Sequence, residues 1–195
     1  MPTPTQPQLE PLDRTQVLTA MGITALVLLI ASRFWLAFDT VDMLPVSVRP
    51  SAVGLGVALA LGISLASEGA YRLWPAYRTS ADTYLALVIK PLTWVDLIWL
   101  GLLPGLSEEL LFRGVMLPAI GLNWFGVLVS SLCFGVLHYS GSQQWSYVVW
   151  ATVVGAALGA SALLTGNLLV PIVAHIVTNL ISSSTWKLKQ LEVSG

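Results

Sequence analysis

Polar side chains interrupt the apolar segments in the second half of this 195-residue chain, and those that could do chemistry together are Glu108, Glu109, Arg113, His138, His175 and Asn179. An ionisable side chain at membrane depth costs roughly 2.5 kcal/mol or more, so each of them needs a partner or a function. A carboxylate, two imidazoles and an amide are the groups that a hydrolytic site requires. They can supply a base for water, ligands for a metal or proton carriers, and donors for an oxyanion.

The two adjacent acids cannot play the same role, because neighbouring residues on a helix point about 100° apart. Glu109 lies four residues before Arg113 and is its natural ion-pair partner. Glu108 has no local cation, which makes it the better candidate for a general base or a metal ligand. A kink or a restart of the helix at Pro104-Gly105 would place both acids near a helix N-terminus, whose partial positive charge helps to keep a carboxylate ionised.

Taken singly, the polar residues also have structural explanations. His138 alone is typical of an interfacial histidine, and Asn179 alone is typical of a hydrogen bond between helices. Glu68 and Arg72 form a neutralised i, i+4 pair near the end of an apolar segment. The joint occurrence of an acid, two histidines and an amide on three separate segments favours a functional site.

These residues must be positioned by membrane helices. Hydrophobic residues make up 55% of the chain and charged residues 10%, with mean hydropathy +0.78, whereas about a quarter of a soluble domain is charged. A helix crosses a bilayer with about 20 apolar residues. The apolar segments of about this length are 16–38, 51–74, 94–117, 124–138, 145–164 and 168–186.

The sequence therefore predicts an all-α, polytopic membrane helix bundle of six to seven transmembrane helices, with the polar motifs on three of the last four. The short apolar segment 81–89 is a re-entrant helix or part of a seventh crossing. We expect a disordered N-terminal tail at 1–15, one membrane domain at 16–188 and a C-terminal tail at 189–195. The eight tryptophans lie near segment ends and mark the membrane boundaries.

Small residues and basic residues predict how the helices pack and how the chain is oriented. Glycines four residues apart allow close approach between helices: Gly101 with Gly105, and Gly155 with Gly159. Basic residues gather in the second connection (72–90) and after the last apolar segment (187–189), which predicts cytoplasmic N- and C-termini. Membrane lipid is then an obligatory partner. Nucleic acid is excluded, because the net charge is −1 and no basic stripe is present.

Three motifs together resemble the CPBP family, which is named for CAAX proteases and bacteriocin-processing enzymes and contains the Abi-type domain. The motifs are Glu108-Glu109-x-x-x-Arg113, Phe134-x-x-x-His138 and His175-x-x-x-Asn179. The resemblance covers about 94–184. It implies a membrane-embedded peptidase that hydrolyses a peptide bond of a membrane-associated peptide or protein, with Glu108, His138, His175 and Asn179 as catalytic residues and Glu109 and Arg113 in support.

The resemblance leaves two mechanisms open. In one, Glu108, His138 and His175 bind zinc or another divalent metal, which lowers the pKa of its bound water to about 7. In the other, Glu108 and His138 activate water without a metal, while His175 and Asn179 stabilise the oxyanion. Other functions are a scaffold or immunity protein that retains the fold, and a small transporter or proton relay, although no repeated halves are visible. The chain is shorter than the family's eight-helix prenyl-protein proteases, which use additional helices to hold a prenylated substrate. The resemblance therefore does not imply that the substrate of this chain is prenylated.

Overall fold

The computed structural model describes residues 12–194, so most of the predicted N-terminal tail lies outside the described residues. Every regular element in the described part is helical, as predicted. The elements in chain order are α1 (Arg14–Phe38), α2 (Pro50–Leu73), α3 (Pro75–Ile89), α4 (Asp96–Glu109), the π-helical segment η1 (Leu110–Met116), α5 (Leu117–Ile120), α6 (Trp124–Leu137), the 3₁₀ turn η2 (Ser142–Gln144), α7 (Trp145–Thr165) and α8 (Leu169–Ser194).

Four described helices are long and apolar enough to cross a membrane: α1, α2, α7 and α8. The helix α6 is apolar but has 14 residues, fewer than a full crossing requires. Many large apolar side chains remain exposed on the outer faces of α1 and α2, for example Ile30, Phe34 and Leu65. Exposure on this scale fits contact with lipid and not with water. The chain is a membrane protein.

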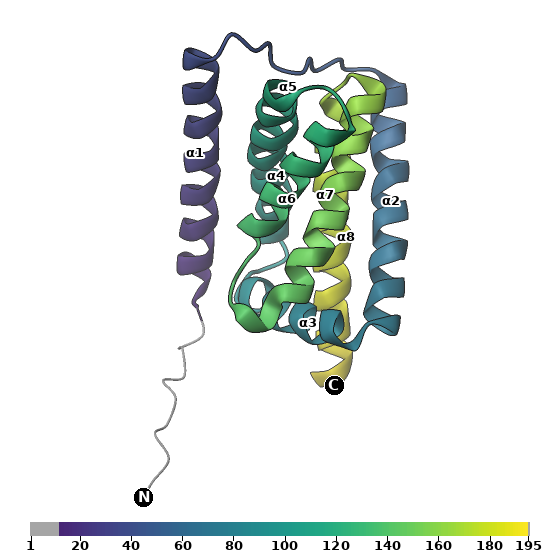
Figure 1. Ribbon diagram of the computed structural model, residues 1–195. Helices are drawn as coiled ribbons and strands as arrows, with labels where there is room; N and C mark the ends of the chain where they lie inside the picture. Colours follow the sequence, from purple (N-terminus) through teal and green to yellow (C-terminus); the bar gives the residue numbers. More distant parts are fainter. Residues whose placement is uncertain (1–11, 195) are drawn as a thin grey trace, which may run out of the picture.

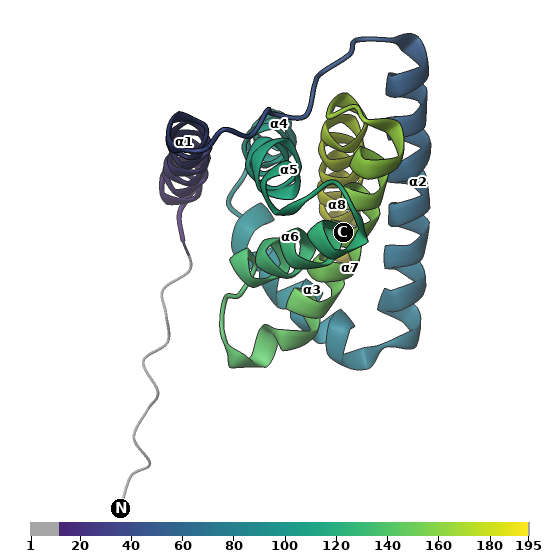
Figure 2. The ribbon, with the colours of Figure 1, turned by 45° about the horizontal axis from the view of Figure 1, so that its top comes forward.

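The helices form a bundle with α1 and α2 on opposite sides (Figure 1). The helix α8 packs against α2 and α4, and α7 packs against α6 and α8. The first helix, α1, contacts α4 and η1. The short helix α3 lies across one end of the bundle, at the end where α1 begins and α8 finishes (Figures 1 and 2).

The predicted restart of the helix at Pro104-Gly105 does not occur. Pro104 lies inside α4, which runs on without interruption into η1 and α5. Glu108 and Glu109 are therefore the last residues of α4, and the expectation of a helix N-terminus beside them is wrong. Pro104 has no N–H and so leaves the Leu100 carbonyl without its helical donor. The side-chain amide of Asn179 on α8 donates a long hydrogen bond of 3.5 Å to that carbonyl, which compensates in part for the missing bond.

The predicted close packing at glycines is confirmed. A Cβ atom added to Gly105 would lie 2.5 Å from Cγ1 of Ile176, and one added to Gly155 would lie 3.1 Å from Nη2 of Arg113. Close approach at Gly105 brings α4 against α8, and close approach at Gly155 brings α7 against the Arg113 guanidinium. Both contacts lie next to the polar motifs.

Several helix ends differ from the prediction for local reasons. The helix α1 begins at Arg14, since Asp13 and Gln16 form a capping box with bonds of 2.8 and 2.9 Å. The helix α8 continues past residue 188, where we predicted a tail, and Lys189 on this extension lies 3.7 Å from Glu68. The helix α3 starts at Pro75, earlier than the predicted segment 81–89, because proline is favoured in the first turn of a helix.

Residues 39–49, here termed the strap, cross the opposite end of the bundle from α3 (Figure 1). The Leu44 N–H donates to the Gly114 carbonyl of η1 at 2.9 Å. The Asn167 side chain exchanges two hydrogen bonds of 2.9 Å with the Ser47 backbone. Gly166 precedes it with φ +58°, a left-handed conformation that ends α7 and that glycine adopts without strain. The strap thus ties the first two helices to the segment that carries the motifs.

Candidate active site

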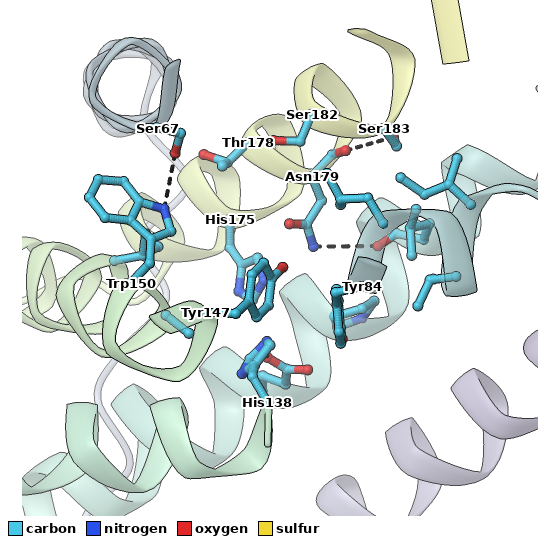
Figure 3. A pocket seen from close by; sticks show the side chains of 18 of the residues that line it. Ser67, Tyr84, His138, Tyr147, Trp150, His175, Thr178, Asn179, Ser182 and Ser183 are labelled. Atoms are coloured by element: carbon cyan, nitrogen blue, oxygen red, sulfur yellow. Dashed lines mark hydrogen bonds and ion pairs between the residues drawn. The ribbon is translucent and has the colours of Figure 1, made fainter. Parts of the chain in front are cut away.

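Glu108, His138, His175 and Asn179 line one cavity of about 170 Å³, here termed the site cavity. Glu108 comes from the end of α4, His138 directly follows α6, and His175 and Asn179 lie one turn apart on α8. Figure 3 shows His175 and Asn179 projecting from α8, and His138 from the end of α6, into the same space. The chain has only two histidines, and both reach this cavity.

Glu109 holds Arg113 and His175 together. Its Oε1 accepts hydrogen bonds from Nη1 of Arg113 and from Nδ1 of His175, both at 2.8 Å. Arg113 is completely buried, donates from Nη2 to the Gly155 carbonyl, and lies 4.4 Å from the centre of the Phe134 ring. The predicted Glu109–Arg113 pair therefore forms, and it also fixes the orientation of His175, which the sequence did not indicate.

Glu108 faces His138 across a short gap. Oε2 of Glu108 lies 4.0 Å from Nε2 of His138, and this oxygen is buried without a hydrogen-bond partner among the described residues. Nδ1 of His138 lies 2.9 Å from the Phe134 carbonyl oxygen, which can only accept, so Nδ1 carries the proton. A neutral His138 then turns an unprotonated Nε2 toward Glu108. Two acceptors face each other, and a water molecule that donates one hydrogen to each would satisfy both.

Donors line the α8 side of the same cavity. His175 donates a hydrogen bond from Nδ1 to Glu109, so its Nε2 is the nitrogen left for a ligand, and this nitrogen is a donor only when the ring is doubly protonated. The Asn179 side-chain amide donates one of its two hydrogens to the Leu100 carbonyl, and the second hydrogen is left for a ligand. Thr178 is 8% exposed, and its hydroxyl has no partner among the described residues. This wall can donate hydrogen bonds to a carbonyl oxygen opposite Glu108 and His138.

The sequence analysis missed an aromatic wall of the cavity, formed by Tyr77, Tyr84, Tyr147 and Trp150. The rings of Tyr84 and Tyr147 stack with centres 4.4 Å apart, and each lies between 6 and 6.5 Å from the His138 ring. Burial raises the pKa of Tyr84 to about 12, and the charge of Glu108 adds to the shift, so this phenol keeps its proton. Trp150 was interpreted as a boundary marker, yet its indole donates to Ser67 inside the bundle. No motif spacing pointed to these residues, since they come from α3 and the start of α7.

The predicted metal ligands do not form a three-ligand set. Among residues 12–194, no group of three His, Cys, Asp or Glu side chains is arranged to hold a metal ion. His175 and His138 each use Nδ1, toward Glu109 and toward the Phe134 carbonyl, so Nε2 of each ring is left for a ligand. As the structure arranges them, these two nitrogens and the Glu108 carboxylate do not form the three-ligand set of a protein zinc site.

Comparison with known proteins gives one family match, over the segment that carries the three motifs, and one similar curated protein. Residues 90–181 match the family model described as "Type II CAAX prenyl endopeptidase Rce1-like". The uncharacterized protein YpbD of Bacillus subtilis (strain 168) is 31% identical over 122 residues, which cover 63% of this chain. The chain spans 62% of the length of that relative. No solved structure matches the chain.

Proposed function

We propose that the chain is an intramembrane endopeptidase that cleaves membrane-associated peptides or proteins, on the premise that its residues 90–181 match the model of the Rce1-like CAAX prenyl endopeptidases. The observation that carries the proposal is the facing pair of Glu108 and His138, 4.0 Å apart, on the wall of a cavity that also receives His175 and Asn179. These groups supply a base on one side and donors on the other.

The reaction begins with a water held between Oε2 of Glu108 and Nε2 of His138. As its oxygen attacks the carbonyl carbon of the scissile peptide bond, one proton passes to Glu108. The oxyanion of the tetrahedral intermediate accepts hydrogen bonds from Asn179 and from Nε2 of His175, which must be doubly protonated to donate there. Glu109 is the adjacent carboxylate that balances this charge. Collapse breaks the C–N bond, and the proton on Glu108 moves to the leaving amine.

The test uses purified protein in proteoliposomes with two quenched fluorescent reporter peptides. One reporter carries a farnesylated CAAX sequence, and the other is an unprenylated hydrophobic peptide. We expect the wild type to cleave at least one of them and Glu108→Gln to lose about 10²-fold or more in turnover. Asp42→Asn makes the same chemical change at an exposed acid of the strap and should keep wild-type turnover. Equal turnover of the wild type and Glu108→Gln would refute the proposal.

The metal-free form of the mechanism has its own test. We expect purified wild type to contain no stoichiometric zinc or other divalent metal, and chelators to leave reporter cleavage unchanged. His138→Ala and His175→Ala should slow cleavage without changing the metal content. If the wild type contains a stoichiometric metal that is lost in His138→Ala or His175→Ala, the metal-free mechanism is wrong, but the position of the active site stands.

A further inference from the structure

A second cavity of about 560 Å³ lies between α2, α3 and α8, at the end of the bundle that carries α3. We term it the outer cavity. Its walls are largely apolar, with Ala81, Leu85 and Ala86 on α3 and Ile181 and Trp186 on α8. None of the catalytic motifs in the sequence pointed to this space, and nine of its sixteen lining residues come from α2 and α3, which lie outside the family match.

The outer cavity and the site cavity are separated by a single layer of side chains. Four residues line both cavities: Ser67 on α2, Tyr77 and Leu85 on α3, and Ser182 on α8. The Ser67 hydroxyl accepts a hydrogen bond of 3.1 Å from Trp150, a residue of the site cavity. The two spaces therefore share one wall, made of these side chains.

Hydroxyl groups follow the route from the outer cavity to the site. Ser64 lines the outer cavity and Thr178 lines the site cavity, and both have hydroxyls buried without a partner among the described residues. Ser67 and Ser182 lie at the wall between them. Buried hydroxyls are normally paired, so unpaired ones along a path indicate a missing polar ligand. The backbone amides of an extended peptide would satisfy them.

The mouth of the outer cavity is held by exposed interactions that link its three helices. Lys189 on α8 lies 3.7 Å from Glu68 on α2 and 5.4 Å from the centre of the Tyr71 ring. The Tyr71 hydroxyl donates to Asp82 on α3 at 2.9 Å. Exposed ion pairs contribute only about 0–1 kcal/mol each. An incoming chain can therefore displace these contacts at little cost.

The helices α2 and α8, which flank the outer cavity, pack closely against each other nearer the strap. A Cβ atom added to Gly56 on α2 would lie 2.7 Å from Cβ of Val173 on α8. The outer cavity lies further along both helices, beside Ser64–Tyr71 of α2 and Ile181–Gln190 of α8. The helices α2 and α8 can thus separate at the mouth of the outer cavity while the contact between Gly56 and Val173 is kept.

We propose that the outer cavity binds the segment of the peptide substrate that flanks the scissile bond. The substrate then reaches Glu108 by passing between α2 and α8 at the end of the bundle that carries α3. This inference rests on the proposed function. The occupant is an extended, largely apolar peptide. Its side chains contact the α3 and α8 walls, and its backbone bonds to the hydroxyls of Ser64, Ser67, Ser182 and Thr178.

The first test blocks the outer cavity in a Cys133→Ser background, which removes the single native cysteine. Thr185→Cys places a thiol in the outer cavity, and Leu61→Cys places a matched thiol on a half-exposed site that lines neither cavity. Each variant is compared with itself before and after labelling with a bulky maleimide. We expect labelling at 185 to lower kcat/KM for the reporter peptides on the order of tenfold, and labelling at 61 to leave it unchanged. Equal responses at the two positions would overturn the inference.

The second test measures crosslinking of the reporter peptides, so it depends neither on turnover nor on the folding of the cysteine variants. A photoreactive benzoylphenylalanine replaces Ala86 in the Glu108→Gln protein, with Leu61 as the control position. We expect irradiation to crosslink the reporter peptides at position 86 and not at position 61. Crosslinks to lipid alone at position 86 would overturn the inference, whereas the proposed function fails separately if Glu108→Gln cleaves the reporters like the wild type.

Discussion

Oε1 of Glu109 accepts hydrogen bonds from Arg113 and from His175, and all three side chains are buried. Arg113 in turn bonds to the Gly155 carbonyl, so this acid connects α4, η1, α7 and α8. A buried charge that loses its partner destabilises a protein strongly, because the remaining charge stays desolvated. The orientation of a candidate catalytic histidine is therefore coupled to the stability of the helix bundle.

Glu109→Leu should lower the free energy of unfolding by about 3–5 kcal/mol, because it leaves the Arg113 guanidinium buried and unpaired. Adding Arg113→Met removes that charge and should restore a large part of the lost stability. Reporter cleavage should stay low in both variants, since His175 has lost its acceptor. Denaturant unfolding in detergent together with turnover measures the two effects. A double variant less stable than Glu109→Leu would contradict this account.

At the scale of elements, the site depends on how closely α4 approaches α8. Gly105 allows this approach, because a Cβ atom there would meet Cγ1 of Ile176 at 2.5 Å. Glu108 and Glu109 follow Gly105 by one turn on α4, and His175 precedes Ile176 on α8. A wider spacing between the two helices would move both acids away from His175.

Gly105→Ala should therefore destabilise the bundle by about 1–3 kcal/mol, as overpacking does, and should also lower turnover. Ile176→Ala in the same chain removes the clashing atom and should recover both properties in part. Gly62→Ala is the matched control, since a Cβ atom there meets nothing within 4 Å. Thermal unfolding in detergent and reporter cleavage give the readouts. Equal loss in the Gly105 and Gly62 variants would show that packing between α4 and α8 is not the cause.

The sequence predicted the helices and motif positions well, because apolar length and glycine spacing are local properties. It failed at Pro104, where α4 continues because a residue on α8, Asn179, bonds to the carbonyl that the proline leaves free. It also missed Tyr84 and Tyr147, whose place beside His138 depends on α3 lying across the end of the bundle. Such contacts join residues far apart in the chain, and no spacing in one sequence encodes them.

At the scale of the whole molecule, positive charge gathers at one end of the bundle. Six of the nine lysines and arginines lie at the end that carries α3: Arg14, Arg72, Arg78, Lys90, Lys187 and Lys189. Arg33 and Arg49 lie toward the strap, and Arg113 is buried. Cytoplasmic loops of membrane proteins carry the excess of basic residues. We propose that the α3 end, at which α1 begins and α8 ends, faces the cytoplasm.

Topology reporters fused to the C-terminus test this orientation. A green fluorescent protein fusion should fluoresce and an alkaline phosphatase fusion should be inactive, because the first folds in the cytoplasm and the second does not. Replacing Arg78, Lys90, Lys187 and Lys189 with glutamine should weaken the preference and produce a mixed population. An active phosphatase fusion to the unaltered chain would show the reverse orientation.

The two hydrogen bonds between Asn167 and Ser47 fasten one end of the bundle, whereas exposed side-chain pairs cross the mouth of the outer cavity at the other end. The helix α2 is consequently fixed at its strap end and held less firmly beside the outer cavity. Thermal motion between α2 and α8 will be greatest beside the outer cavity. Asn167→Ala would remove the two hydrogen bonds at the strap end as well. The motion of α2 would then no longer be concentrated beside the outer cavity.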